Sequence, residues 1–286
     1  MSFMIALPPK ILVESLFREW LREDLGRGDR ATGAIIKENH PQQEAIWMAK
    51  QTGIIAGLPF AEQIFSLLGE TDCSPQVKEG SFCQEKQEIL RLSGAPHTLL
   101  SGERVALNLV MRLSGIATLT QCYAEKIADF PAQLVDTRKT TPGLRLLEKY
   151  ATQVGGAVNH RFGLDDAAMI KENHIRVAGG VKNAIERVRS NLPYPLTIEV
   201  ETTTEAEVEE ALTTDVNIIM LDNMPLPLMK QMVTQIRNSG KPIKIEASGN
   251  VNLNTIRQVA ETGVDYISTS APITQATWLD LSMKLL

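Results

Sequence analysis

The sequence has few cysteines, no excess of positive charge and no long apolar run. Its three cysteines, Cys73, Cys83 and Cys122, form no CxxC pair. This argues against a disulfide framework or a zinc site, and it is typical of a reducing compartment in which the thiols act as small buried hydrophobes. The formal net charge is −5, so the overall electrostatics give no support to a nucleic-acid partner. Any basic site must be local.

Membrane and export signals are also missing. The stretch MSFMIALPPK (1–10) has neither a basic region nor a long apolar core, and no run approaches the roughly 18 apolar residues of a spanning helix. We therefore expect no signal peptide, no membrane partner and a cytoplasmic protein. At 286 residues, with 43% hydrophobic and 22% charged residues, the chain suits one large globular domain or two ordinary ones.

The second half of the chain alternates between short β-branched runs and helical patterns. Strands are predicted at 132–137, 157–163, 167–173, 196–201, 216–223, 243–249 and 264–270. Helix signals agree, because Thr204 precedes acidic residues as an N-cap and Gly240 and Gly263 are typical helix ends. Such alternation predicts βα units and a parallel α/β sheet. About seven strands favour a closed or nearly closed barrel, with an open doubly wound sheet as the alternative.

The first part of the chain has a different pattern, which predicts a smaller α/β domain. An amphipathic helix is expected at 11–25, with Ile11, Leu12, Ser15, Leu16, Trp20 and Leu21 near one face. Strand-like pieces at 44–57 and 87–94 follow, and then a helical stretch at 103–130. We place the domains at 1–105 and 106–286, with the C-terminal segment as a candidate to pack back on the first domain.

The segment VDTRKTTPGLRLLEKY (135–150) places two cations, Arg138 and Lys139, directly before a predicted helix start. A helix N-terminus carries partial positive charge, so cations there are normally unfavourable. An anion held between these side chains and the helix would offset the repulsion. Thr141 is the predicted N-cap, with Pro142 at the first helical position.

Polar residues gather where the predicted strands end, which in βα barrels is the active face. Cations occupy the first three strands, carboxylates the middle two and small residues the last two. In chain order they are Asp136, Arg138, Lys139, Asn159, His160, Arg161, Lys171, Glu172, His174, Glu199, Glu201, Asp222, Asn223, Glu246, Ser248, Gly249, Ser268 and Ser270. This segregation predicts a substrate with carboxylates at one end and a phosphate at the other. The paired acids suit Mg²⁺ or ribose hydroxyls.

Each feature taken alone has a structural alternative. Arg138 and Asp136 would suit a strand-end salt bridge, and His160 with Arg161 would suit a satisfied polar pair. Glu199 and Glu201 are two residues apart on a strand, so they face the same side and require cationic or metal partners if buried. Only the joint pattern favours a site.

These motifs resemble the quinolinate phosphoribosyltransferases (nicotinate-nucleotide pyrophosphorylases, carboxylating) over nearly the whole chain. The resemblance rests on EDLGRGD (23–29), GIIAGLP (53–59), ERVALNLVMRLSGIAT (103–118), DTRKTTPGLRLLEKYA (136–151), GGAVNHRFGLDDAAMIKENHI (155–175), IEVE, LDNM and EASGNVNLNTIRQVAETGVDYIS (246–268). Together these segments are highly specific, whereas no single one would be.

The resemblance implies an N-terminal α/β sandwich domain followed by an incomplete seven-stranded α/β barrel, assembled as a homodimer or a hexamer. It implies transfer of phosphoribosyl from phosphoribosyl pyrophosphate to quinolinate with Mg²⁺. The products are nicotinate mononucleotide, pyrophosphate and CO₂, a step of NAD biosynthesis.

The resemblance also implies a role for individual residues. Quinolinate would be bound by Arg138, His160, Arg161 and Lys171, with Arg104 reaching in from the neighbouring subunit. Phosphoribosyl pyrophosphate would be bound by Lys139, Thr140, Glu201, Asp222, Ser248, Gly249, Asn250 and Ser270. Lys139, Lys171, Glu201 and Asp222 would be catalytic, and Glu201 and Asp222 would hold the metal.

Two segments depart from the family pattern. GDRAT (28–32) stands where GDIT is usual, and TSAPITQ (269–275) replaces a loop like VGALTHS, so that Ser270 takes the place of a glycine. The alternatives are a paralogue linked to molybdenum transport, a barrel lyase or aldolase with Lys171 as Schiff-base nucleophile, and a non-catalytic module that binds a phosphorylated sugar.

Overall fold

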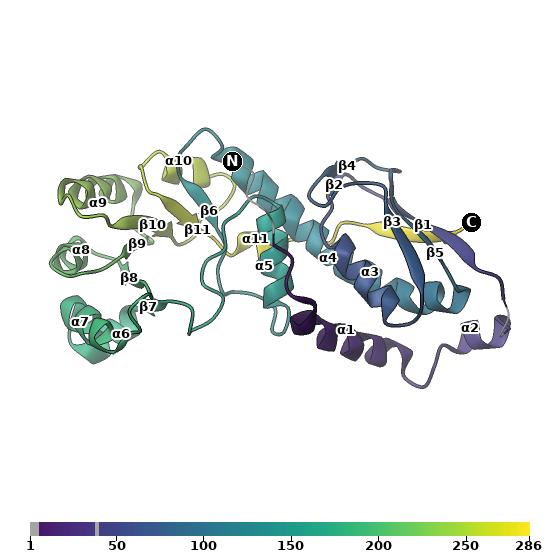
Figure 1. Cartoon of the computed structure of the whole chain (residues 1–286). Helices are drawn as coiled ribbons and strands as arrows, with labels where there is room; N and C mark the ends of the chain where they lie inside the picture. Colours follow the sequence, from purple (N-terminus) through teal and green to yellow (C-terminus); the bar gives the residue numbers. More distant parts are fainter. Residues whose placement is uncertain (1–5, 38–39) are drawn as a thin grey trace. The chain divides into compact units, whose positions relative to one another are not determined.

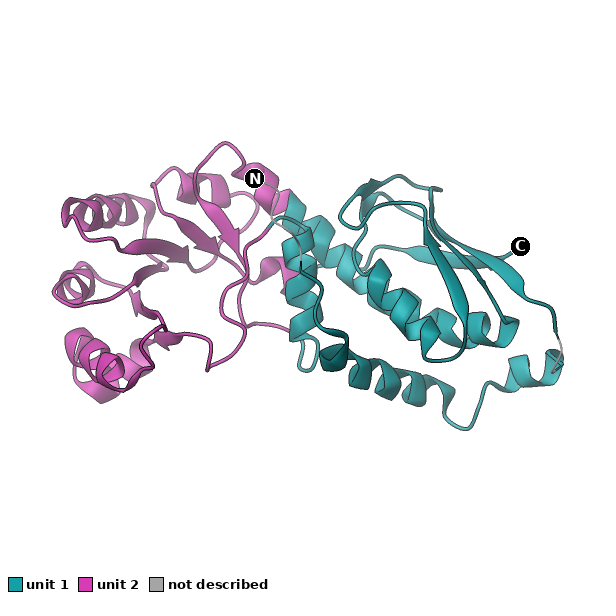
Figure 2. Ribbon diagram, in the orientation of Figure 1, with its two compact units in different colours: residues 1–121, 141–156, 275–286 teal, residues 122–140, 157–274 magenta. Residues whose placement is uncertain are grey.

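The structure is a computed structural model that describes residues 6–37 and 40–286. Contacts divide the chain into two compact units (Figure 2). The first comprises residues 1–121, 141–156 and 275–286, and the second comprises residues 122–140 and 157–274. The predicted boundary at residue 105 lies inside helix α4 (Pro96–Lys126), whereas the units divide at residue 121.

The first unit contains an antiparallel sheet with the strand order β12-β1-β5-β3 (Figure 1). Its strands are β1 (Gln43–Ala49), β3 (Thr71–Pro75), β5 (Glu88–Gly94) and β12 (Leu281–Leu285). A second, two-stranded sheet pairs β2 (Gly53–Ile54) with β4 (Phe82–Cys83). Because β12 pairs with β1, the C-terminal segment completes the edge of a sheet built from the N-terminal part.

The helices of the first unit are α1 (Lys10–Leu25), α2 (Arg30–Ile35), α3 (Leu58–Ser66), α4 and α5 (Arg145–Val154). The predicted face of α1 was wrong: Ile11 and Leu12 are 85% and 57% exposed, and the buried stripe is Val13, Phe17 and Leu21. These residues are spaced four apart on one face. The Phe17 ring lies 6.1 Å from that of Phe60 on α3, and this aromatic contact fixes which face is buried.

Helix α5 begins later than predicted, because Thr141 is not its N-cap. Gly143 has φ +81°, a left-handed conformation that a helix starting at Pro142 would not tolerate. The Thr141 hydroxyl donates to Glu148 Oε1 at 2.9 Å and the Thr141 amide donates to Glu148 Oε2 at 2.8 Å. The hydroxyl is therefore a donor to a buried carboxylate instead of an acceptor for helix amides.

Helix α4 is the one helix among the described residues that is long and apolar enough to cross a membrane. Within its most apolar 18-residue window, 61% is buried inside the structure. Residues such as Ala106, Val110 and Ile116 have no exposed surface. This burial is typical of the core helix of a folded domain.

The second unit is built on a parallel sheet with the strand order β6-β11-β10-β9-β8-β7 (Figure 1). Its strands are β6 (Gln133–Val135), β7 (Ala168–Ile170), β8 (Ile198–Thr202), β9 (Ile218–Asp222), β10 (Lys244–Ser248) and β11 (Tyr266–Ser268). The seventh predicted strand, 157–163, is reduced to one bridge between Val158 and Val135 at the β6 edge. No pairing of described residues joins that edge to β7, so the barrel is incomplete.

Helices follow the strands of the second unit in sequence: α6 (Glu172–Ala178), α7 (Val181–Asn191), α8 (Glu205–Leu212), α9 (Leu226–Asn238), α10 (Ile256–Ala260) and α11 (Ala271–Thr274). The predicted N-cap Thr204 is confirmed, since its side chain accepts from the Glu207 amide. The parallel pairing brings the carboxyl ends of the strands to one edge, and Ser248 of β10 lies in register with Asp222 of β9.

Candidate functional site

The predicted site residues lie in the second unit, with one exception. Arg104 is on α4 of the first unit, where its side chain is 59% exposed. The others follow or end the parallel strands: Arg138, Lys139 and Thr140 after β6, His160 and Arg161 after the Val158 bridge, Lys171 after β7, Glu201 on β8, Asp222 on β9, Ser248, Gly249 and Asn250 at the end of β10, and Ser270 after β11.

Asp136 organises the turn that carries His160 and Arg161. This carboxylate is 2% exposed, and its two oxygens accept from the Asn159 side chain at 2.7 Å and from the His160 amide at 2.8 Å. Arg138 makes no hydrogen bond or ion pair with it in the part of the chain that the structure describes. The strand-end salt bridge considered above is therefore absent, and the guanidinium of Arg138 is available for a ligand.

Arg161 and Arg138 lie close enough to repel each other. Burial, followed by the charge of Arg138, lowers the pKa of the Arg161 guanidinium, while Glu199 and Asp166 raise it. One Arg161 nitrogen, Nη1, donates to the Ala167 carbonyl at 2.7 Å and so orients the side chain. Two guanidinium groups held together in this way are unfavourable without a bound anion, and a planar dicarboxylate would supply the missing charge.

The predicted metal ligands Glu201 and Asp222 stand on the neighbouring strands β8 and β9. Glu201 Oε2 accepts from Lys171 Nζ at 3.0 Å, and Asp222 Oδ2 accepts from the Asn223 side chain at 2.9 Å. Both are carboxylates, which are the ligands that Mg²⁺ prefers, and both are partly exposed.

Two buried glutamates that were given no role in the sequence prediction lie next to His160. Its Nε2 atom is 3.1 Å from Glu199 Oε2 and 3.7 Å from Glu246 Oε2. Glu199 and Glu246 are each 3% exposed, and one oxygen of each lacks a hydrogen-bond partner among the described residues. The two-residue spacing of Glu199 and Glu201 predicted their shared face, and strand-end position placed Glu246 on the same edge, but the sequence did not indicate that His160 would approach both Glu199 and Glu246.

The three ligand atoms of this cluster lie within 4.8 Å of one another, close enough to surround a metal ion. The hydrogen bonds of His160 argue against that use. Its Nδ1 accepts from the Arg161 amide at 2.7 Å, so the ring proton of a neutral imidazole resides on Nε2, facing the glutamates. A nitrogen that carries a proton cannot bind a metal. The cluster therefore fits a shared proton better than a cation.

Burial and the neighbouring charge of Glu199 raise the pKa of Glu246 from 4.5 to about 7, although His160, Ser268 and Lys171 lower it. The folded state thus favours the neutral carboxyl. The stabilisation that the neutral Glu246 carboxyl gives to the folded state is fully present below pH 4.5. It is lost as the pH rises to about 7.

We expect Glu246→Gln to remove this pH dependence. Relative to the variant, the wild type should lose roughly 3 kcal/mol of unfolding free energy across that window. Urea unfolding followed by circular dichroism at a series of pH values measures this. Glu186→Gln, at a 59% exposed position on α7, is the control. Parallel pH profiles for wild type and Glu246→Gln would contradict the assignment.

The small residues after β10 form a tight turn beside Asn223. Gly249 has φ +97°, and a Cβ there would lie 2.3 Å from Cγ of Asn223, so only glycine fits. Asn250 has φ +51°. Ser270 is not among the described residues with left-handed backbone, so the serine that replaces the family glycine causes no strain there.

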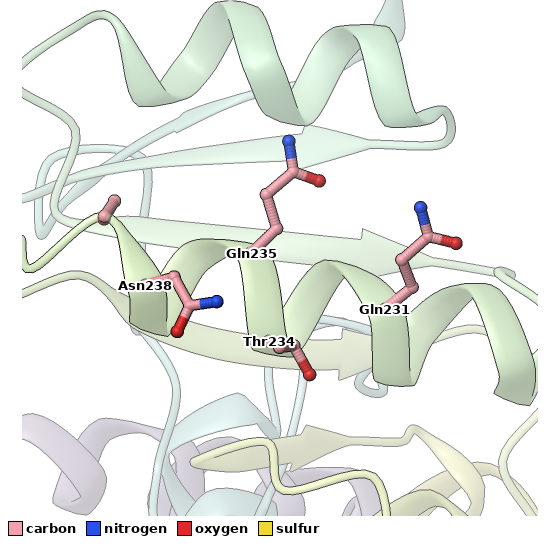
Figure 3. A pocket seen from close by; sticks show the side chains of 5 residues that line it. Gln231, Thr234, Gln235 and Asn238 are labelled. Carbon is pink, nitrogen blue, oxygen red and sulfur yellow. The ribbon is translucent and has the colours of Figure 1, made fainter.

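A separate hollow on α9 lacks the charged side chains that the strand ends carry. It is lined by Gln231, Thr234, Gln235, Asn238 and Ser239, and Figure 3 shows the two glutamines extending from the same side of the helix. Gln231 donates to Glu205 of α8 at 2.9 Å, which occupies its amide. No charged or aromatic side chain lines this hollow, so it offers no acid, base or anion-binding group.

Comparison with known proteins gives full-length matches. The quinolinate phosphoribosyl transferase N-terminal domain matches residues 29–114, and the C-terminal domain matches residues 116–284. The chain is 52% identical over 283 residues to a probable nicotinate-nucleotide pyrophosphorylase [carboxylating] of Synechocystis, covering 99% of this chain and 95% of that one. It is 39% identical to quinolinate phosphoribosyltransferase [decarboxylating] 1b of Nicotiana tabacum, covering 99% and 86%.

Solved structures agree. NadC from Streptococcus pyogenes has a TM-score of 0.93 at 39% identity and covers 98% of this chain and 99% of its own. The nicotinate-nucleotide pyrophosphorylase from Francisella tularensis has a TM-score of 0.92 at 34% identity with complete coverage of both chains. Since both domain families and full-length relatives match, this chain belongs to the quinolinate phosphoribosyltransferase family.

Proposed function

We propose that this protein transfers phosphoribosyl from phosphoribosyl pyrophosphate to quinolinate and releases CO₂, as a carboxylating nicotinate-nucleotide pyrophosphorylase of NAD biosynthesis. One observation in the structure carries the proposal. Arg138 and Arg161 are close enough for their charges to repel, and Arg161 lies on the turn that Asp136 fixes through the His160 amide. A planar molecule with two adjacent carboxylates suits that arrangement.

The chemistry follows from positioning. Arg138, Arg161 and Lys171 bind the two carboxylates of quinolinate, which orients the ring nitrogen toward C1 of the sugar. The nitrogen forms a bond to C1 while pyrophosphate leaves with the electron pair of the broken C1–O bond. The pyridinium then takes up the pair of the ring–carboxylate bond as CO₂ leaves. The pyridine nitrogen attacks with its own lone pair and has no proton to lose, so no dedicated general base is required. The ring carbanion accepts a proton from water, which leaves hydroxide.

The residues that bind phosphoribosyl pyrophosphate contact different parts of that molecule. Lys139 and Thr140 contact the pyrophosphate, Glu201 and Asp222 approach the ribose, and Ser248, Gly249, Asn250 and Ser270 hold the 5′-phosphate. Glu201 and Asp222 also suit Mg²⁺, because both are partly exposed carboxylates. The ion, when bound, neutralises charge on the departing pyrophosphate.

His160 takes a different part from the direct carboxylate contact implied by the resemblance. Its Nδ1 accepts from the Arg161 amide and its Nε2 faces Glu199. Because Nδ1 accepts from the Arg161 amide and the buried Nε2 lies 3.1 Å from a Glu199 oxygen, we propose that His160 orients the Arg161 backbone, and that the Arg161 guanidinium contacts the substrate.

We further propose that the protein works in the cytoplasm as a homodimer or a hexamer, with Arg104 entering the neighbouring site. Two features support an assembly. Arg104 is 59% exposed, and its guanidinium forms a long 3.8 Å ion pair with the adjacent Glu103. Ile11 and Leu12 on α1 are 85% and 57% exposed, an apolar surface that association would cover.

Subunit mixing tests the crossing arginine. Arg104→Ala and Lys171→Ala homodimers should each be nearly inactive. If Arg104 serves the partner's site, each mixed dimer regains one intact site, and random exchange restores about a quarter of wild-type activity. If Arg104 acted in its own subunit, each chain of a mixed dimer would keep one defect and no activity would return.

The activity itself is tested by incubating the protein with quinolinate, phosphoribosyl pyrophosphate and Mg²⁺ and measuring nicotinate mononucleotide and CO₂ together. Equal amounts of both products, with none from nicotinate in place of quinolinate, support the proposal. Donor binding without product would favour a non-catalytic sugar-phosphate module. Borohydride trapping of Lys171 with an oxo-acid would favour a lyase. Neither product nor binding would favour the molybdenum-linked paralogue.

A further inference from the structure

Asn223 lies between two groups that the proposed function assigns to the ribose and to the 5′-phosphate of the phosphoribosyl donor. Its Nδ2 donates to Asp222 Oδ2 at 2.9 Å, and its Oδ1 accepts from Asn250 Nδ2 at 2.9 Å. The Asn223 amide also donates to the Ser248 carbonyl at 2.9 Å across the ends of β9 and β10. One side chain thus joins the carboxylate on β9 to the turn after β10.

The orientation of the Asn223 amide is determined by both partners. If oxygen and nitrogen were exchanged, the oxygen would face the Asp222 carboxylate and the nitrogen would face the Asn250 amino group, and both contacts would be repulsive. The orientation in the structure satisfies both contacts at once. The two hydrogen bonds therefore act together to fix the Asp222 carboxylate relative to the turn.

The backbone has adapted to place this side chain. Asn223 and Asn250 each have φ +51°, a left-handed conformation that costs energy for residues other than glycine. Gly249 leaves the space that Asn223 fills, since a Cβ there would lie 2.3 Å from Cγ of Asn223. Three residues with left-handed backbone thus meet around one side chain, and strain of this kind is characteristic of functional sites.

We propose that Asn223 is a positioning residue, which fixes the distance between the Asp222 carboxylate and the Ser248–Asn250 turn to match a ribose 5-phosphate. The inference rests on the proposed function. The sugar sets the separation between its hydroxyls and its 5′-phosphate, so the protein gains affinity only if the two groups that bind them are held at that separation beforehand. Quinolinate binds through other residues, and its affinity should not depend on Asn223.

Asn223→Gly tests this with little disturbance to the backbone, because glycine adopts the same left-handed φ and only the side chain is lost. The expected result is a rise of about two- to tenfold in the KM for phosphoribosyl pyrophosphate, the loss that one or two hydrogen bonds predict. The dissociation constant of quinolinate, measured by calorimetry without donor, should not change. Asn254→Ala, an exposed asparagine in the following turn, is the matched control.

Two further variants separate positioning from general structure. Asn223→Asp keeps the shape and the acceptor for Asn250, but it sets a second carboxylate against Asp222, so it should impair donor binding more than glycine does. Asn250→Gly should raise the donor KM, and its effect should not add to that of Asn223→Gly if the two residues act through their shared hydrogen bond.

The outcomes distinguish this inference from the proposed function. A wild-type protein that makes no nicotinate mononucleotide and does not bind donor would overturn both. An active wild type whose Asn223→Gly variant keeps the same donor KM would overturn the positioning role alone. So would a variant in which donor and quinolinate affinities fall together, since that pattern indicates general disruption of the barrel edge.

Discussion

Replacing Arg161 by alanine is expected to lower kcat/KM for quinolinate by about two to four orders of magnitude. The loss corresponds to two charge-assisted hydrogen bonds of about 1.5–3 kcal/mol each between the guanidinium and a substrate carboxylate. The effect should be large because burial already weakens the hydration of Arg161, so its guanidinium is free of most of the water that would compete with the substrate. Initial rates at varied quinolinate, with saturating donor, measure it.

The controls distinguish substrate contact from folding. Arg176→Ala makes the same change of charge at a 74% exposed position on α6 and should leave activity unchanged. Arg161→Lys keeps the charge but loses the planar fork, so it should recover only a minor part of the rate. Full activity in Arg161→Ala, or an equal loss in Arg176→Ala, would show that Arg161 does not bind the substrate.

The fold of the second unit was predicted well because its strands are short, apolar and repeated at regular intervals. Six of the seven predicted strands are present within a few residues of their predicted ends. The exception, 157–163, is instructive. Its polar residues are held by Asp136 through the Asn159 side chain and the His160 amide instead of by a strand partner. A strand pattern in the sequence does not reveal that a buried carboxylate will satisfy the backbone.

The candidate site was predicted only in outline. Strand-end position identified Lys171, Glu201 and Asp222, because parallel strands bring their carboxyl ends together. The partners of these side chains depend on distances across the barrel, which sequence spacing does not give. The approach of Glu246 to His160, 86 positions apart in the chain, is one such contact. The bond from Asn250 to Asn223 is another.

The prediction of the buried face of α1 was wrong for a related reason. The sequence contains apolar residues on more than one side of this helix, so periodicity allowed two faces. The contact of Phe17 with Phe60 selects one of them and leaves Ile11 exposed.

Glu148→Leu is expected to lower the unfolding free energy of the first unit by about 3–5 kcal/mol, the usual cost of breaking a buried ion pair. Glu148 is fully buried and accepts from Arg112 Nη2 at 2.8 Å and from Arg112 Nε at 3.2 Å. The Arg112 side chain is only 17% exposed, so solvent cannot replace the lost carboxylate. Thr141, whose amide and hydroxyl both donate to Glu148, loses its acceptor as well.

The tryptophans make this measurement specific, since Trp20, Trp47 and Trp278 all lie in the first unit. Urea unfolding followed by tryptophan fluorescence therefore reports on that unit. Glu23→Leu, an exposed glutamate on α1, controls for the added apolar surface. Equal stability of Glu148→Leu and Glu23→Leu would mean that the buried pair contributes nothing.

The double variant Arg112→Met/Glu148→Leu tests whether the buried ion pair serves stability or activity. Removing both charges restores an apolar contact and eliminates the cost of a buried, unpaired guanidinium, so most of the lost stability should return. The remaining loss comes from Thr141, whose amide and hydroxyl still lack their acceptor. Arg112 also donates to the Ala276 carbonyl at 3.3 Å, which brings α4, α5 and the segment before β12 together. If the double variant is stable but the activity is reduced, the pair serves to hold Thr141, the residue that follows the Arg138–Thr140 loop. If both stability and activity recover, an apolar pair can replace Arg112 and Glu148, and their charges are not needed for either property.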